Sequence, residues 1–164
     1  PPSISTYPSD SNTVQTISST NPINITATEQ YFSAFGKGNL VSRDAAIGYF
    51  RVNGDDKKSE LNLVTTCPAL GGIECSAGQM CNNGDLYATN FDSAPSCCVR
   101  SSTTQSQECI AGTPQPTSTV KYKFSYGPST QLANGYYNID LRVIDRAGND
   151  YETDSTDTWH FNGN

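Results

Sequence analysis

Six cysteines confined to one stretch of the chain restrict what this sequence can fold into. They are Cys67, Cys75, Cys81, Cys97, Cys98 and Cys109, with seven, five, fifteen, no and ten residues between them. A zinc site would need close cysteine pairs or histidines at ligand spacing, and the single histidine, His160, lies far along the chain. An even cysteine count in a polar chain predicts three disulfides and an extracellular, oxidising location.

The cysteine spacing also predicts an insertion over residues 67–110. This segment is rich in Gly, Asn, Asp and Ser and has too few apolar residues for a core of its own. Disulfides restrict the unfolded chain and therefore stabilise a long loop that packing alone would not hold. Cys97 and Cys98 are expected to have different partners, because a bridge between neighbours strains the backbone. The sequence does not select among the remaining pairings.

The stretch from Leu132 to Asn149 alternates between apolar and polar residues. Asn134-Gly135 favours a tight turn at its start, and Ala147-Gly148-Asn149 closes it. The apolar positions between these turns, listed in order, are Tyr137, Ile139, Leu141 and Val143. A period of two predicts a half-buried strand, since the same residues would be spread around every face of a helix.

The same alternation predicts strands over residues 22–28, 45–53, 60–66, 120–126 and 158–161, with a loop or short helical turn over 30–42. The chain is therefore expected to be all-β. We predict an arm or first strand over residues 1–20, the two halves of one sandwich over 21–66 and 120–164, and the cysteine-rich insertion between them. Residues 111–119 form a Pro/Thr/Ser-rich linker.

Two motifs in the tail resemble the last strands of bacterial and archaeal Ig-like domains. These are L-x-x-G-x-Y (Leu132, Gly135, Tyr137) and D-x-A-G-N (Asp145 to Asn149). The resemblance covers about residues 120–161, is fainter over 4–52, and excludes the insertion, whose Leu70 to Cys81 run is similar to inserts in some archaeal surface proteins. It implies an Ig-like antiparallel β-sandwich, as in surface proteins, adhesins and surface filaments, with Tyr137 at a tyrosine corner.

Charge and composition exclude several classes of partner and reaction. The formal net charge is −6, whereas nucleic acids and anionic membranes require a basic face. No apolar run is long enough to cross a bilayer. The chain has no G-x-S-x-G motif, and nothing pairs His160 with a serine and an aspartate. We therefore expect neither nucleic-acid binding, nor a membrane span, nor enzymatic activity.

Calcium is the one cofactor that the sequence suggests. Acidic residues gather near the tail, and Asp145, Asn149, Asp150 and Asp154 carry the oxygen ligands that Ca²⁺ prefers. The alternative is that Asp145 and Asn149 cap a turn by hydrogen bonds to the backbone. Because the spacing is not that of an EF-hand loop, the turn cap is the favoured interpretation, and no other cofactor is predicted.

The N-terminal arm suggests self-association with identical subunits. Its sparse apolar residues, Ile4, Tyr7, Val14 and Ile17, suit either a split first strand of the same sandwich or a strand donated to a neighbouring molecule. Donation would make the chain a structural subunit of a cell-surface filament, pilus-like fibre or surface layer. The rival function is that of an adhesin or carbohydrate-binding module.

Two features concern glycans. Asn24 lies in the only N-x-S/T sequence and on the outward face of a predicted strand, which makes it the glycosylation candidate. A module that binds surface glycans would use exposed aromatic residues, and four that we do not place in the core are Tyr87, Phe91, Tyr136 and Tyr151.

Overall fold

The computed structural model describes residues 3–7, 11–15, 20, 22–32, 37–38, 40–49, 57–58, 61–112, 117–127, 135–152 and 159–161. In this part of the chain the protein is all-β, as predicted, and its one helical element is the short 3₁₀ turn η2 (Pro68–Leu70). None of the described residues belongs to a helix with the length and apolarity needed to cross a membrane.

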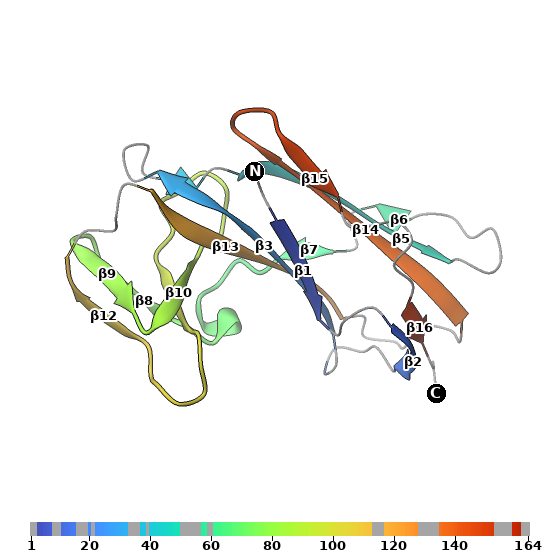
Figure 1. The fold of residues 1–164 in the computed structure, drawn as a ribbon, viewed down its shortest axis with the longest axis horizontal. Helices are drawn as coiled ribbons and strands as arrows, with labels where there is room; N and C mark the ends of the chain where they lie inside the picture. Colours follow the sequence, from blue (N-terminus) through green and yellow to red (C-terminus); the bar gives the residue numbers. More distant parts are fainter. Residues whose placement is uncertain are drawn as a thin grey trace.

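Two large β-sheets contain most of the strands (Figure 1). The first sheet has the order β1 (Ser3–Tyr7), β3 (Ile23–Phe32), β13 (Thr117–Tyr126), β10 (Gly84–Tyr87), β11 (Cys97–Arg100) and β8 (Ile73–Glu74). Two short strands also belong to it: β4 (Lys37–Gly38) pairs with β3, and β7 (Asn62–Leu63) pairs with β13.

The second sheet has the order β2 (Ser11–Gln15), β16 (Trp159–Phe161), β14 (Gly135–Asp145), β5 (Leu40–Tyr49) and β6 (Lys57–Lys58), and β15 (Asp150–Glu152) also pairs with β14. A separate two-stranded sheet joins β12 (Glu108–Ala111) to β9 (Gln79–Asn82). In Figure 1 this small sheet lies at the opposite end of the molecule from β16 and the C-terminus.

The core forms between the inward faces of the two large sheets. β13 pairs with β3 in antiparallel register along its whole length, from Thr117 opposite Phe32 to Tyr126 opposite Ile23. Alternate residues of both strands are buried, as the period of two predicts. They pack against β14 residues to form one cluster: Ile23, Ile25, Ala27, Tyr31, Leu40, Leu61, Ala88, Val120, Tyr122, Phe124, Tyr126, Leu141 and Val143.

The described residues of one predicted loop lie in strands. We expected a loop or short helical turn over residues 30–42, but β3 continues to Phe32 and β5 already begins at Leu40. The extension of β3 is stabilised by β13, which supplies pairing partners for Gln30, Tyr31 and Phe32. Pairing with a distant strand therefore outweighed the weak local turn preference of this segment.

The N-terminal arm is divided between the two sheets. β1 lies at one edge of the first sheet and pairs with β3 in antiparallel register, Ile4 opposite Ala27. β2 lies at the edge of the second sheet and pairs with β16 in parallel register, Val14 opposite His160. The described arm residues thus pair with strands of the same chain.

The cysteine-rich insertion extends the first sheet. β10 lies beside β13 in parallel register, Tyr87 opposite Lys121, and the backbone N–H of Ala88 donates to the carbonyl of Lys121 at 2.9 Å. The following loop reaches the main core, where the ring of Phe91 stacks on Tyr122 with a centroid distance of 5.5 Å. The insertion is therefore anchored to the sandwich by backbone pairing and by an aromatic contact.

All six cysteines form disulfides, with the pairs Cys67–Cys97, Cys75–Cys109 and Cys81–Cys98. Cys97 and Cys98 are consecutive residues of β11, and consecutive side chains of a strand point to opposite faces. One bridge therefore ties the η2 segment to one face of β11, and the other ties β9 to the opposite face. This arrangement explains why two neighbouring cysteines have different partners.

The insertion also has a small second core. Cys67, Leu70 and Cys97 are buried together, with Val64, Tyr87 and Val99 packed against them. Our expectation of no separate core was therefore wrong, because the buried disulfide itself supplies apolar volume. Gly72 permits the close approach of the chain here, since a Cβ at this position would lie 2.5 Å from the sulfur of Cys97.

We predict that Phe91→Ala lowers the free energy of unfolding by about 2 kcal/mol, because it removes a partly buried ring that packs on the core. Urea denaturation followed by circular dichroism measures the effect. The matched control is Tyr151→Ala, which truncates a ring that is 44% exposed and should change the free energy by less than about 0.5 kcal/mol. Equal losses would contradict the anchoring role of Phe91.

The disulfides provide a second prediction. Cys67–Cys97 and Cys75–Cys109 close loops of similar length, with sequence separations of 30 and 34, so their effects on the unfolded chain should be similar. Replacing either pair by alanine should cost about 2–5 kcal/mol. The Cys67/Cys97 pair should cost more because both residues are buried in the second core. Calorimetry of the two double variants tests this order.

Candidate functional site

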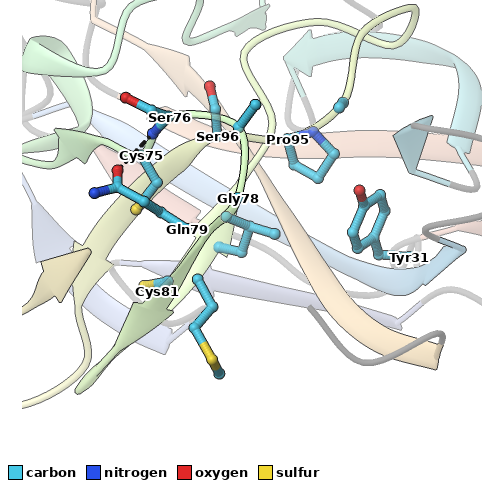
Figure 2. Close-up of a pocket in the computed structure, with 12 residues that line it drawn as sticks. Tyr31, Cys75, Ser76, Gly78, Gln79, Cys81, Pro95 and Ser96 are labelled. Carbon is cyan, nitrogen blue, oxygen red and sulfur yellow. Dashed lines mark hydrogen bonds between the residues drawn. The ribbon is translucent and has the colours of Figure 1, made fainter. Parts of the chain in front are cut away.

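A pocket of about 260 Å³ lies between the end of β3 and the loops of the insertion (Figure 2). Tyr31 lies across the pocket from the loop that carries Ser76, Gly78 and Gln79. The lining is mostly apolar and includes two disulfide-bonded cysteines, Cys75 and Cys81. The residues that line the pocket are Tyr31, Cys75, Ser76, Ala77, Gly78, Gln79, Met80, Cys81, Leu86, Ala94, Pro95 and Ser96.

Covalent and hydrogen bonds hold the pocket wall in place. Cys75 is bonded to Cys109 and Cys81 to Cys98, so both ends of the loop are attached to other strands. Within the loop, the backbone N–H of Ser76 donates to Oε1 of Gln79 at 2.8 Å. The backbone N–H of Cys75 donates to the carbonyl of Ser96 at 2.8 Å, which joins the loop to the segment before β11.

Tyr31 contributes the one aromatic ring among the described residues that line the pocket. It lies on the inward face of β3, is only 6% exposed, and also packs in the main core. Its hydroxyl is not among the fully buried polar atoms without a partner, which in the described part of the chain are Oε2 of Glu29 and the Tyr122 hydroxyl. A hydroxyl that borders an open pocket can exchange a hydrogen bond with water for one with a ligand.

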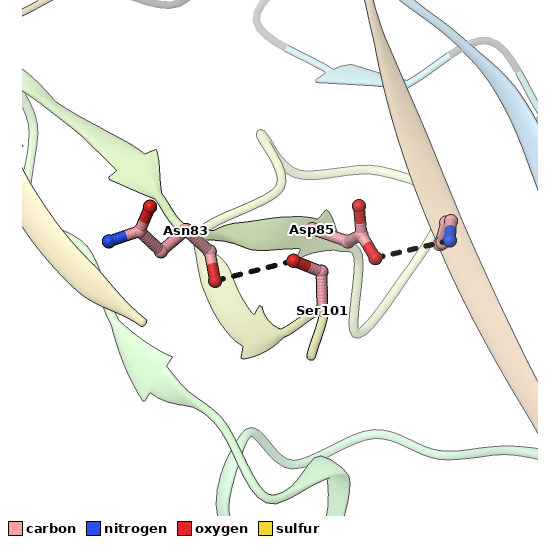
Figure 3. Close-up of polar contacts among 4 residues, drawn as sticks. Asn83, Asp85 and Ser101 are labelled. Carbon is pink, nitrogen blue, oxygen red and sulfur yellow. Dashed lines mark hydrogen bonds and ion pairs between the residues drawn. The ribbon is translucent and has the colours of Figure 1, made fainter. Parts of the chain in front are cut away.

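A second group of polar contacts joins the insertion to β13 (Figure 3). The Lys121 ammonium lies 3.2 Å from Oδ2 of Asp85, and the Ser101 hydroxyl donates to the carbonyl of Asn83 at 3.4 Å. Burial raises the pKa of the neighbouring Tyr87 phenol, while the Lys121 charge opposes the rise. These contacts connect β10 to its neighbours, and we assign them a structural role.

Two further polar atoms are buried in the core. Glu29 is 2% exposed; its Oε1 accepts the backbone N–H of Gln30 at 2.7 Å, and its Oε2 has no partner among the described residues. The Tyr122 hydroxyl also lacks a partner at hydrogen-bonding geometry, although the Leu40 backbone lies near it. Burial raises the pKa of Tyr122 to about 12, so this phenol is neutral at physiological pH.

The predicted calcium ligands lie at the turn between β14 and β15. Asp145 is 2% exposed, and its Oδ1 accepts the backbone N–H groups of Ala147 at 2.9 Å and Asn149 at 2.8 Å. Its Oδ2 accepts the side-chain N–H of Asn149 at 3.1 Å. Gly148 has a φ of +87°, a conformation that favours glycine in such a turn. These hydrogen bonds are those of a turn capped by Asp145 and Asn149, the interpretation that the sequence favoured over a calcium site.

The remaining calcium candidates are not gathered around Asp145 in the described part of the chain. Asp150 is exposed, and its Oδ2 lies 2.9 Å from Nε of Arg142. Asp154 lies outside the described residues. Among the described residues there is no group of three or more His, Cys, Asp or Glu side chains placed to hold a metal ion. Calcium binding stays a prediction from the sequence.

The other predicted site residues are dispersed over the molecule. Asn24 is partly exposed on β3 between buried Ile23 and Ile25, which agrees with an outward-facing glycosylation candidate. Ile4 packs against the core, Tyr7 and Val14 lie in β1 and β2, and Ile17 falls outside the described residues.

The candidate glycan-binding aromatics do not form a common surface among the residues whose side chains are described. Phe91 stacks on Tyr122, and Tyr87 packs against the second core. Tyr151 is exposed, while the side chain of Tyr136 falls outside the described set. The pocket residues were not predicted, because nothing in the sequence places Tyr31 beside a loop that begins 44 residues later in the numbering.

Comparison with known proteins gives no match: no family model, no curated protein and no solved structure is significantly similar to this chain.

The Asp145 turn yields a prediction on pH dependence. Burial alone raises the pKa of Asp145, but hydrogen bonds from Asn149 and Ala147 outweigh it and hold the pKa below its ordinary value. The ionised carboxylate therefore stabilises the fold above the pKa of the unfolded chain, about 4, and this stabilisation is lost as the pH falls below that value.

Asp145→Asn should accordingly lower the free energy of unfolding by about 1–3 kcal/mol at pH 7 and by much less at pH 2. Urea titrations at several pH values measure the difference. Asp150→Asn is the control, since its exposed ion pair should contribute less than about 1 kcal/mol. A loss for Asp145→Asn that does not depend on pH would contradict the role of the charge.

Proposed function

We propose that this chain is a structural module of an extracellular cell-surface assembly, a filament, pilus-like fibre or surface layer, and that its sandwich belongs to the Ig-like class. The observation that carries the proposal is the division of the N-terminal arm between the edges of both sheets. Three disulfides support the extracellular part of the proposal, since such bridges persist in oxidising compartments.

The strand order supports the Ig-like assignment. In an immunoglobulin sandwich the first, second, fifth and fourth strands form one sheet in the order A-B-E-D, and the third, sixth and seventh form the other. Here β1, β3, β13 and β7 are neighbours in one sheet, and β5, β14 and β16 are neighbours in the other. Taken in order along the chain, the strands that correspond to A, B, C, D, E, F and G are β1, β3, β5, β7, β13, β14 and β16. Tyr137, near the start of β14, occupies the position of a tyrosine corner.

The two halves of the arm would then be a split first strand, and they suit assembly by strand exchange. Each half supplies an edge strand and pairs with one neighbouring strand, β3 or β16. An identical arm from a second copy would make the same hydrogen bonds, so exchange between copies costs little enthalpy. Repetition along a row of molecules would produce a fibre.

The binding-module alternative rests on a different observation, the pocket beside Tyr31. An adhesin or carbohydrate-binding module of a larger secreted protein would use such a concave site and would not need the arm to leave its own sheet. The two functions are separated by whether the arm pairs within one chain or between chains.

Cysteine cross-linking distinguishes these arrangements. Ser5 in β1 lies directly opposite Thr26 in β3, so the double variant Ser5→Cys/Thr26→Cys places two cysteines at paired positions. Pairing between copies should give a ladder of disulfide-linked oligomers on a non-reducing gel, and filaments by electron microscopy. Pairing within one chain should give cross-linked monomers.

The single variants Ser5→Cys and Thr26→Cys are the controls for scrambled disulfides, since neither should form the ladder. A chain without residues 1–20 should lose any oligomers seen by light scattering. Cross-linked monomers at every protein concentration, together with unchanged light scattering after truncation, would rule out assembly through the arm.

A further inference from the structure

The pocket beside Tyr31 combines the hydroxyl of this residue with mostly apolar walls. Tyr31 as a residue is more than nine-tenths buried, and it is one of the residues that line the pocket. We propose that this pocket binds a small neutral molecule with an aromatic ring, whose polar substituent forms a hydrogen bond with the Tyr31 hydroxyl. The proposal is independent of the assembly function, because the pocket lining includes none of the described arm residues.

The volume of the pocket sets the size of the ligand. At about 30 Å³ per water molecule in the liquid, 260 Å³ corresponds to about nine waters. A single bridging water would leave most of this space without contacts, whereas one substituted ring would contact several walls at once. Pockets with apolar walls and few polar groups are the usual sites for such ligands.

The lining determines the chemistry of the ligand. None of the described residues that line the pocket is Lys, Arg, Asp or Glu, so a charged ligand would lose its hydration without gaining a counter-ion from them. Two other polar groups of the wall already have partners: the Ser96 hydroxyl donates to Oε2 of Glu74 at 2.6 Å, and the Ser76 N–H donates to Gln79. The side-chain groups left for a ligand are therefore the Tyr31 hydroxyl, the Ser76 hydroxyl and the N–H groups of the Gln79 amide.

Sulfur atoms favour an aromatic ring over an aliphatic one. Met80 lines the pocket together with Cys75 and Cys81, and sulfur makes favourable contacts with ring edges. The two disulfides also fix the loop that carries these residues before any ligand arrives. Such pre-organisation reduces the entropy that binding would otherwise cost.

Met80 is the only methionine of the chain, which permits a direct test. Protein labelled with ¹³C at the methionine methyl group gives one resonance that reports on the pocket. Titration with p-cresol, a neutral substituted ring, should shift this resonance in a saturable way. The anionic analogue p-hydroxybenzoate should bind at least ten-fold more weakly, because the pocket offers its carboxylate no counter-ion.

Two variants locate the binding. Tyr31→Phe removes only the hydroxyl and should weaken p-cresol binding about five-fold. Ala94→Phe, at an exposed position of the wall, should fill the pocket and abolish the saturable shift. Tyr151→Phe removes a hydroxyl outside the pocket and should leave the affinity unchanged, and circular dichroism confirms that each variant is folded.

Three outcomes would overturn the proposal. The first is the absence of a saturable shift of the Met80 resonance with p-cresol. The second is an affinity that is the same in the parent chain, Tyr31→Phe and Ala94→Phe. The third is equal binding of p-cresol and p-hydroxybenzoate, which would contradict the neutral ligand class.

Discussion

The pairing of β13 with its neighbours is the constraint on which the rest of the structure depends. On one side β13 pairs with β3 over its full length, and on the other it pairs with β7 and β10. Its inward residues Val120, Tyr122 and Phe124 are fully buried in the main core. One strand therefore connects the two halves of the sandwich and the insertion, and a change in its register would move every one of these side chains to the opposite face.

The insertion is held together by a different balance of forces. Its apolar cluster is small, and three disulfides compensate for the limited burial. Because Cys97 and Cys98 point to opposite faces of β11, the bridges tie a layer to each side of this strand. The insertion also covers part of the edge of β13, and covering an exposed edge protects a sheet from pairing with other chains.

Polar atoms in the core have consequences for both stability and binding. Glu29, Tyr31 and Tyr122 occupy inward positions of β3 and β13, where the alternation would suit apolar residues. Glu29 and Tyr122 each leave one oxygen unpaired inside the protein, which lowers the stability of the fold. Tyr31 differs from them because it borders a pocket and its hydroxyl is not one of these buried unpaired atoms, so a ligand could bind this hydroxyl in place of water.

The sequence by itself determined the all-β class, the inward faces of residues 23–27 and 120–126, the turn at Asp145 and the participation of the cysteines in disulfides. These features follow from alternation, turn chemistry and cysteine count, which are properties of neighbouring residues. Only the tertiary structure decided the cysteine partners, the extension of β3 to Phe32, the parallel pairing of β10 with β13 and the pocket between Tyr31 and the Ser76 loop. Each of these depends on which distant segments meet, and that is fixed by the packing of the whole chain, since no local preference encodes it.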